Sequence, residues 1–301
     1  MHFTAMYCDC LFTMFFLMGL FYLYSSNDYL KQGPIFKSCI CLFFASWTRA
    51  NGTFNLFFIG YRFLHIFVKL FIDNQHKIWP TFKRILTYIP LGLFSVVCIV
   101  TPFFAHMYYL YSIYCVQLPT QIIDYQPPSY CTEGFWKGYS YLQTQFFGVV
   151  FMVWSNLYNL FMNYRVFPIV IFYVVFMLKL VFNQPGEVFL MGIPSVVDEK
   201  SVEVAKPRGN FMKSPMLVPF FWAPLVNWAA MLFNSHVINA TRIYCQNPLV
   251  FWYAAYVLSG GKPTEDGKAP EFTIKRHWIL IYFIGRFITG PIVFGGYSPW
   301  F

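Results

Sequence analysis

One uninterrupted apolar stretch, residues 85–116, decides the fold class, and it reads ILTYIPLGLFSVVCIVTPFFAHMYYLYSIYCV. It contains no Asp, Glu, Lys or Arg, and it is longer than the ~20 apolar residues that cross a bilayer as a helix. A surface helix of this length in a water-soluble protein would carry a polar face. The stretch therefore predicts a membrane-spanning helix, kinked at Pro90 and Pro102 because each proline frees a backbone carbonyl.

The composition of the whole chain supports the same environment. Of the 301 residues, 58% are hydrophobic, 23% are aromatic and only 11% are charged, whereas a soluble domain carries about 25% charged residues. So little charge excludes a water-soluble enzyme. The 38 Phe, 22 Tyr and 9 Trp also exclude a disordered chain, because they supply ample apolar surface to bury.

Five further apolar runs approach the length of a span, and they cover residues 7–24, 139–164, 166–182, 216–235 and 278–294. With the first stretch they predict an all-α, polytopic membrane protein, with about six transmembrane helices in a single domain over residues 1–301. The run at 249–258 is too short to cross. The hydrophilic stretches 194–215 and 259–277 are expected to be extramembrane loops.

Residues 61–79 have a different pattern. Five polar side chains recur with helical spacing on one face, and they are Arg62, His65, Lys69, Asp73 and His76. We interpret this segment as an interfacial basic amphipathic helix, because cations in the hydrocarbon core cost at least about 2.5–3.5 kcal/mol each. The residues expected to contact lipid phosphate are Arg62, His65, Lys69, Lys77, Lys83 and Arg84. The alternative is a true span whose polar stripe faces the interior of the helix bundle.

The basic residues are distributed unevenly in this topology. With 61–79 on the surface, 14 of the 21 Lys and Arg fall on one side of the membrane. This bias places both termini on the side away from the cytoplasm or the mitochondrial matrix. The net charge of +9 is explained by this bias and by attraction to anionic lipid, so we expect no nucleic-acid partner.

Catalytic and cofactor-binding patterns are missing from the sequence. All twelve acidic residues lie outside the centres of the predicted spans, which disfavours a proton-translocating subunit. No metal-ligand spacing, histidine box, Walker A or G-x-S-x-G pattern is present. We therefore expect no metal, no other cofactor and no catalytic residue.

The remaining candidate sites are contacts between helices. Four amides fall on one face of the predicted span 139–164, and they are Gln145, Asn156, Asn159 and Asn163. Because amides in lipid need partners, this face is expected to contact other helices or subunits, as is Arg286 in the last span. The alternative function is a solute transporter that uses this polar face as its path. Cys115 and Cys131 bracket one loop and form a disulfide if that loop meets an oxidising compartment.

The sequence shares features with two groups of mitochondrial proteins. The mitochondrial carrier motif P-x-[DE]-x-x-[KR] begins at Pro185-Gly186-Glu187 but has Leu190 in place of the base, so a carrier is not supported. The chain resembles the Phe- and Tyr-rich accessory proteins of protist mitochondrial respiratory complexes and ATP synthases. This likeness rests on runs such as Phe15-Phe16, Phe57-Phe58 and Tyr108-Tyr109, and on a hydrophobic start without a presequence.

The resemblance implies a non-catalytic accessory subunit of the respiratory chain or ATP synthase, in the mitochondrial inner membrane. It also implies contacts with other membrane subunits of a large electron-transport or ATP-synthase assembly, and bound phospholipid such as cardiolipin. The alternative location is the endoplasmic reticulum membrane, where the sequon at Asn51 or Asn239 would be glycosylated.

Overall fold

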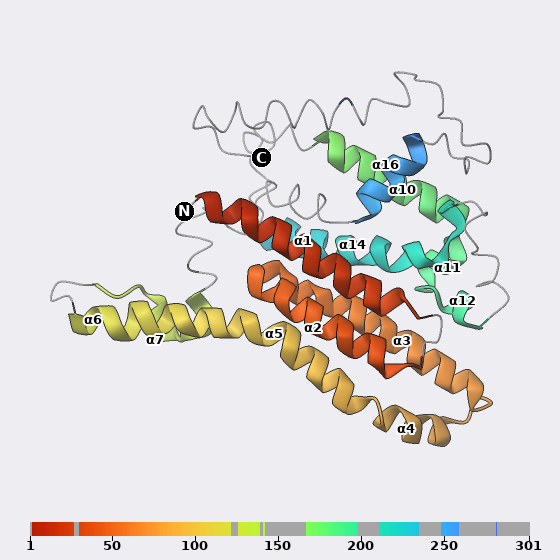
Figure 1. The fold of residues 1–301 in the computed structure, drawn as a ribbon, viewed down its shortest axis with the longest axis horizontal. Helices are drawn as coiled ribbons and strands as arrows, with labels where there is room; N and C mark the ends of the chain where they lie inside the picture. The colour runs from red at the N-terminus through yellow and green to blue at the C-terminus, as the bar shows by residue number, and fades with distance from the viewer. Residues whose placement is uncertain are drawn as a thin grey trace. The chain divides into compact units, whose positions relative to one another are not determined.

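The computed structural model describes residues 2–26, 30–121, 126–138, 141, 167–197, 211–234, 248–258 and 281 (Figure 1). The chain forms two compact units, Met1–Phe151 and Met152–Phe301. Within the described ranges the regular structure is entirely helical and contains no strand. This confirms the all-α prediction for that part of the chain.

The first unit begins with two helices that lie side by side, α1 (His2–Tyr24) and α2 (Gln32–Thr48). They pack through aromatic side chains, with the ring centroids of Phe15 and Phe44 5.2 Å apart. Gly19 allows a close approach, since a Cβ atom there would lie 2.7 Å from a methyl carbon of Leu42. Helix α2 was not predicted from the sequence, and with 17 residues it is shorter than a typical span.

The predicted helix 61–79 is not one helix in the structure. A 3-10 turn, η1 (Ala50–Asn55), leads into α3 (Leu56–Asp73), and a separate helix, α4 (Ile78–Leu86), follows. The chain reverses direction between them with left-handed backbone at Gln75 (φ 53°) and His76 (φ 61°). The expected boundaries 61–79 are therefore wrong, because the break falls inside them.

The predicted span 85–116 corresponds to a long helix that starts slightly later. It comprises α5 (Ile89–Tyr111), a π-helical segment η2 (Ser112–Gln117) and α6 (Leu118–Gln121). Pro90 lies in the first turn of α5, where the missing N–H is tolerated, and Pro102 lies inside α5. Two short elements, α7 (Tyr130–Glu133) and η3 (Phe135–Lys137), follow.

The second unit contains α10 (Phe167–Asn183), α11 (Pro185–Phe189), α12 (Ile193–Val197), η6 (Phe211–Lys213), η7 (Pro215–Leu217), α14 (Val218–Asn234) and α16 (Pro248–Leu258). Its core is aromatic: the Tyr253 ring lies 4.8 Å from that of Phe172 and 5.0 Å from that of Phe176. The Tyr173 hydroxyl donates a hydrogen bond to the Phe220 carbonyl at 3.3 Å, which ties α10 to α14.

Among the described residues, two helices are long and apolar enough to cross a membrane, Gly52–Asp73 and Ile89–Gln121. Shorter apolar helices occur at Leu11–Tyr24, Ile171–Asn183 and Pro215–Val226. Most of the expected spans 139–164 and 278–294, and the expected loop 259–277, lie outside the described residues. The other expected loop, 194–215, contains helical turns at both ends, and its part at 198–210 is also outside them.

Candidate functional site

The first half of the polar stripe of α3 is buried, contrary to the expectation that Arg62 and His65 contact lipid phosphate, whereas Lys69 is half-buried and Asp73 is exposed. Arg62 is 2% exposed and His65 is 5% exposed. The His65 ring lies 4.3 Å from the Tyr61 ring one turn earlier, and Lys69 pairs with Asp73 at 3.5 Å. The burial of Arg62 and His65 matches the alternative interpretation, in which the polar stripe faces the interior of the helix bundle. A buried cation is stable only where protein groups replace water.

The other three expected lipid contacts behave differently. Lys77, Lys83 and Arg84 are exposed, and they lie on or next to α4 rather than on α3. The structure therefore separates the six predicted lipid-binding residues into a group on α3, with Arg62 and His65 buried and Lys69 half-buried, and an exposed basic group at α4.

A buried polar contact joins α2 to α5. The Ser95 hydroxyl donates to the Leu91 carbonyl at 2.7 Å, so its proton is already used. The Cys39 thiol, 2.9 Å from Ser95 Oγ, is therefore the donor in the contact between the helices. Both residues are fully buried, and the pair fixes the register of α2 on α5.

A second polar site lies in the short helices of the other unit. Glu187 lies in α11. A tight turn with left-handed backbone at Met191 (φ 52°) and Gly192 (φ 72°) then brings the chain back toward Glu187. The Gly192 N–H donates to the Glu187 carbonyl at 2.7 Å, and the Ser195 hydroxyl donates to the Gly192 carbonyl at 2.7 Å. Trp222 closes the site from α14, because its indole N–H donates to the Val188 carbonyl at 2.8 Å.

This arrangement changes the chemistry of the Glu187 carboxyl. Burial raises its pKa above the ordinary value of 4.5, and hydrogen bonding with the Ser195 backbone opposes that rise. Its Oε2 atom is buried and has no hydrogen-bond partner among the residues that the structure describes. The carboxyl can therefore take up a proton at a higher pH than an exposed glutamate, and sequence reasoning recorded it only as part of an incomplete carrier motif.

An open apolar groove runs along one face of α5 and can accept hydrocarbon. It is formed within the first unit by Val96, Val97, Val100, Thr101, Phe104, Ala105, Tyr108 and Phe135. Ring contacts hold Phe135 in place, since its centroid is 6.4 Å from that of Phe104 and 6.1 Å from that of Tyr108.

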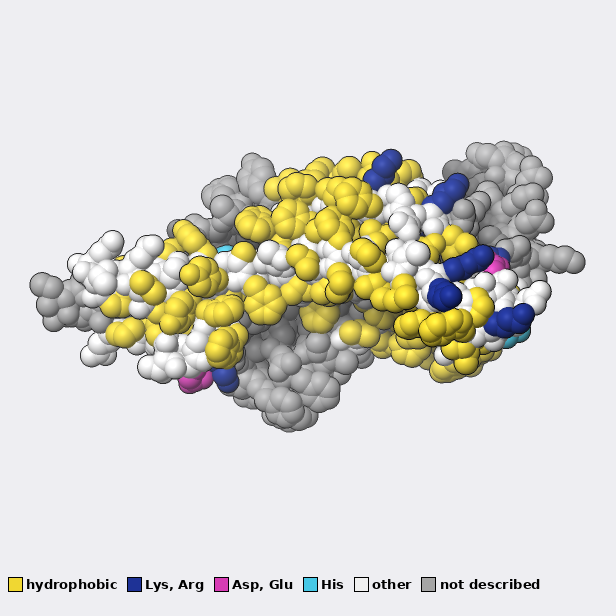
Figure 2. All heavy atoms as spheres, turned by 90° about the horizontal axis from the view of Figure 1, so that it is seen from below, with side chains coloured by type: hydrophobic (Ala, Val, Ile, Leu, Met, Phe, Trp, Pro, Cys, Tyr) yellow, Lys and Arg dark blue, Asp and Glu magenta, His cyan; other side chains and the backbone are white. Residues whose placement is uncertain are grey.

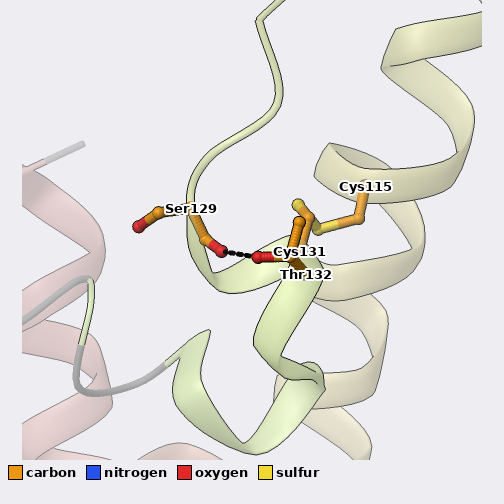
Figure 3. Close-up of a disulfide and its surroundings, with 4 residues drawn as sticks. All are labelled: Cys115, Ser129, Cys131 and Thr132. Atoms are coloured by element: carbon orange, nitrogen blue, oxygen red, sulfur yellow. Dashed lines mark hydrogen bonds between the residues drawn. A yellow bond between two sulfur atoms is a disulfide. The ribbon is translucent and has the colours of Figure 1, made fainter.

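Figure 3 shows the disulfide that joins Cys115, in the π-helical segment, to Cys131 in α7. The Thr132 hydroxyl donates to the Ser129 carbonyl at 2.8 Å, which holds the turn before Cys131. The other expected contact residues, Gln145, Asn156, Asn159, Asn163 and Arg286, lie outside the described part of the chain. Where the structure describes side chains, no three His, Cys, Asp or Glu residues gather into a metal site.

Comparison with known proteins gives a family match over nearly the whole chain. The family model described as Mannosyltransferase (PIG-V) matches residues 1–300. GPI alpha-1,6-mannosyltransferase 2 of Cricetulus griseus is 25% identical over 93% of this chain and 65% of the relative. The human protein of the same name is 23% identical over 92% of this chain and 64% of the relative. The chain thus spans slightly under two thirds of the length of these relatives, and no solved structure matches it.

These matches overturn the mitochondrial interpretation. The resemblance to accessory proteins of respiratory complexes and ATP synthases is wrong, because the match over residues 1–300 is to a family of sugar-transferring proteins. The inferences that depended on this resemblance are also wrong: a non-catalytic subunit of the respiratory chain, large-complex partners, electron transport and cardiolipin. The inner-membrane location is unsupported, and solute transport is not what the family description names.

Proposed function

Because this chain belongs to the Mannosyltransferase (PIG-V) family, we propose that it takes part in transferring mannose in α1→6 linkage to a GPI glycolipid. The observation that carries the proposal is the family match over residues 1–300. The names of the hamster and human relatives supply the linkage and the glycolipid.

We place this activity in the endoplasmic reticulum membrane, which was the alternative location. An apolar composition with 11% charged residues supports a polytopic membrane protein, as do the helices Gly52–Asp73 and Ile89–Gln121. A glycolipid keeps its hydrocarbon in the bilayer, so an enzyme that acts on it must present its site at the membrane surface. The apolar groove lies on α5, within the helix Ile89–Gln121 that is long enough to reach that surface from within the bilayer.

The proposal is tested by complementation. The chain is expressed in mammalian cells that lack GPI alpha-1,6-mannosyltransferase 2, and a GPI-anchored protein at the cell surface is measured by flow cytometry. A chimera, in which the chain replaces its matched segment of the hamster relative, is expressed in parallel because the chain spans 65% of that relative.

We expect surface display to return with the chain or with the chimera. Restoration by the chain assigns the transfer to these 301 residues, and restoration by the chimera alone assigns them a part of the enzyme. The proposal is contradicted if both proteins reach the endoplasmic reticulum membrane at the level of the rescuing relative and neither restores display.

A further inference from the structure

The helix α4 exposes an apolar face and a basic face at the same time. Ile78 is 78% exposed and Trp79 is 66% exposed, and Phe82 and Leu86 continue this apolar stripe. Lys83 and Arg84 lie exposed in the last turn, and Lys77 is exposed just before the helix. No carboxylate among the described residues pairs with any of these three cations. An exposed apolar stripe beside cations without carboxylate partners is unfavourable in water and suits a membrane surface.

The side of α4 that faces the protein is equally well defined. Thr81 is buried, and its hydroxyl donates to the Lys77 carbonyl at 2.7 Å. The Asn74 side chain, at the end of α3, donates to Thr81 Oγ1 at 3.3 Å and to the Leu70 carbonyl at 2.8 Å. These bonds hold α4 against the end of α3, so its apolar stripe points away from the unit as a fixed surface.

The position of α4 between two candidate spans places it at a membrane surface. The span Gly52–Asp73 ends directly before it, and the span Ile89–Gln121 begins directly after it. A short connection between two antiparallel spans emerges at the headgroup level. An amphipathic helix with Trp and cations lies in that plane, apolar side down. Lys83 Nζ is 5.6 Å from the centre of the Trp79 ring, which brings a cation and an interfacial aromatic side chain together.

Other cations gather at the same end of the first unit. The Tyr88 hydroxyl, between α4 and α5, donates to the Leu30 carbonyl in the turn between α1 and α2 at 2.9 Å. That turn carries exposed Lys31, and Lys37 follows in α2. In Figure 2 most of the Lys and Arg side chains of this face gather around α4 and the neighbouring helix ends, whereas the surface over α5 is largely hydrophobic.

The opposite end of the long helix carries the disulfide. The helix Ile89–Gln121 has 33 residues, or roughly 50 Å at 1.5 Å per residue, which is enough to cross a bilayer. A disulfide persists in an oxidising compartment, so the Cys115–Cys131 end belongs on the lumenal side. The α4 end then faces the cytoplasm, where anionic lipids are enriched and positive residues accumulate.

From these placements we propose that α4 is an interfacial anchor that binds anionic phospholipid headgroups of the cytoplasmic leaflet. Ile78, Trp79, Phe82 and Leu86 enter the acyl boundary, and Lys77, Lys83 and Arg84 pair with headgroup phosphates and carboxylates. The inference rests on the membrane placement and not on the sugar transfer.

The test uses the full chain in nanodiscs that contain equal amounts of phosphatidylserine and phosphatidylcholine. Native mass spectrometry counts each lipid retained after release into detergent. The variant is Lys83→Gln/Arg84→Gln, whose side chains are exposed on α4. The charge-matched control is Lys137→Gln/Lys213→Gln, two exposed lysines in other elements. The charge-preserving variant Lys83→Arg/Arg84→Lys shows whether lipid retention depends on the positive charge alone.

We expect the original chain, the control and the charge-preserving variant to retain phosphatidylserine in preference to phosphatidylcholine. The α4 variant should lose about tenfold or more of that preference, because each basic residue near an anionic surface contributes about 1 kcal/mol. Equal retention by the α4 variant and the original chain overturns the proposal, as does an equal loss in the control. Monodisperse elution of every variant shows that the difference is not caused by unfolding.

Discussion

Gly52 approaches Ser46 so closely that a Cβ atom on residue 52 would lie 2.7 Å from the Ser46 hydroxyl oxygen and 2.8 Å from its backbone nitrogen. This contact sets the turn in which η1 leaves α2 and directs the chain into α3. The Gly52 N–H also donates to the Arg49 carbonyl at 2.9 Å, which closes the same turn.

Gly52→Ala should therefore destabilise the first unit. The added methyl group meets the backbone of α2 and cannot move aside, and overpacking of this kind costs about 1–3 kcal/mol. Thermal unfolding followed by size-exclusion chromatography should show a lower midpoint. The matched control is Gly60→Ala within α3, where nothing lies within 4 Å of the added carbon. Alanine should raise helix stability there by about 0.5–1 kcal/mol. Equal midpoints for the two variants would contradict the contact.

Ser95→Ala should weaken the packing of α2 on α5. The change leaves the buried Cys39 thiol without the acceptor that it uses at 2.9 Å, and a hydrogen bond of this kind contributes about 0.5–1.5 kcal/mol. The control is Ser112→Ala, which removes the same type of bond to a carbonyl, from Ser112 Oγ to the Tyr109 oxygen at 2.7 Å, at an exposed site. The expected result is a lower unfolding midpoint for the Ser95 variant alone.

The disulfide makes a prediction about membrane orientation. A flexible tag with a glycosylation sequon, inserted after Gln126, should be glycosylated in microsomes, because this exposed position lies beside the Cys115–Cys131 link. The same tag inserted after Asn74, next to α4, should stay unmodified. Both results are measured as glycosidase-sensitive mobility on a gel. Modification at position 74 would show that α5 has the opposite orientation.

Glu187→Gln should make the second unit less sensitive to pH. Because the folded pKa of Glu187 lies above its ordinary value of 4.5, the folded state holds the proton more tightly than the unfolded state. The stability that the protonated Glu187 carboxyl gives the folded state is fully present below pH 4.5 and is lost as the pH rises through the folded pKa. Glutamine keeps an acceptor for Ser195 without the charge. The variant should unfold at a higher temperature than the original chain at neutral pH and at a similar one in acid. A destabilised variant at neutral pH would show that the charged form is the one the site favours.

The apolar segments were the most predictable part of the fold. The stretch 85–116 has no charge and no competing interpretation, and the structure forms the helix Ile89–Gln121 there. Helix α2 was not predicted, because it is only 17 residues long and its polar residues Lys37, Ser38 and Ser46 interrupt the apolar pattern. Its serines are buried against neighbouring helices, a tertiary effect that hydropathy along one segment does not register.

The break between α3 and α4 was missed although the sequence contains a signal for it. Pro80 lies in the first turn of α4, a position typical of a helix start, and Asn74 caps the end of α3 through its side chain. The cationic stripe misled the interpretation, because periodicity gives the face of a helix but not whether protein or lipid covers it.

The functional conclusion had little support in the sequence alone. No short motif, of the kind that identifies a phosphate loop or a zinc site, pointed to sugar transfer in this sequence, and composition indicates only the membrane. The residues on which the first interpretation depended, paired aromatic side chains such as Phe57-Phe58, serve packing in any apolar helix bundle. Similarity over residues 1–300 carried the information that local patterns lacked.

The central claim is tested most directly by the lipid product itself. Cells lacking GPI alpha-1,6-mannosyltransferase 2 are labelled with radioactive mannose, and their glycolipids are separated by thin-layer chromatography with and without the chain or its chimera. The account predicts that the accumulated precursor falls and that a glycolipid with one more mannose, sensitive to an α1,6-specific mannosidase, appears. An unchanged precursor in cells that carry either protein in the endoplasmic reticulum membrane would contradict it.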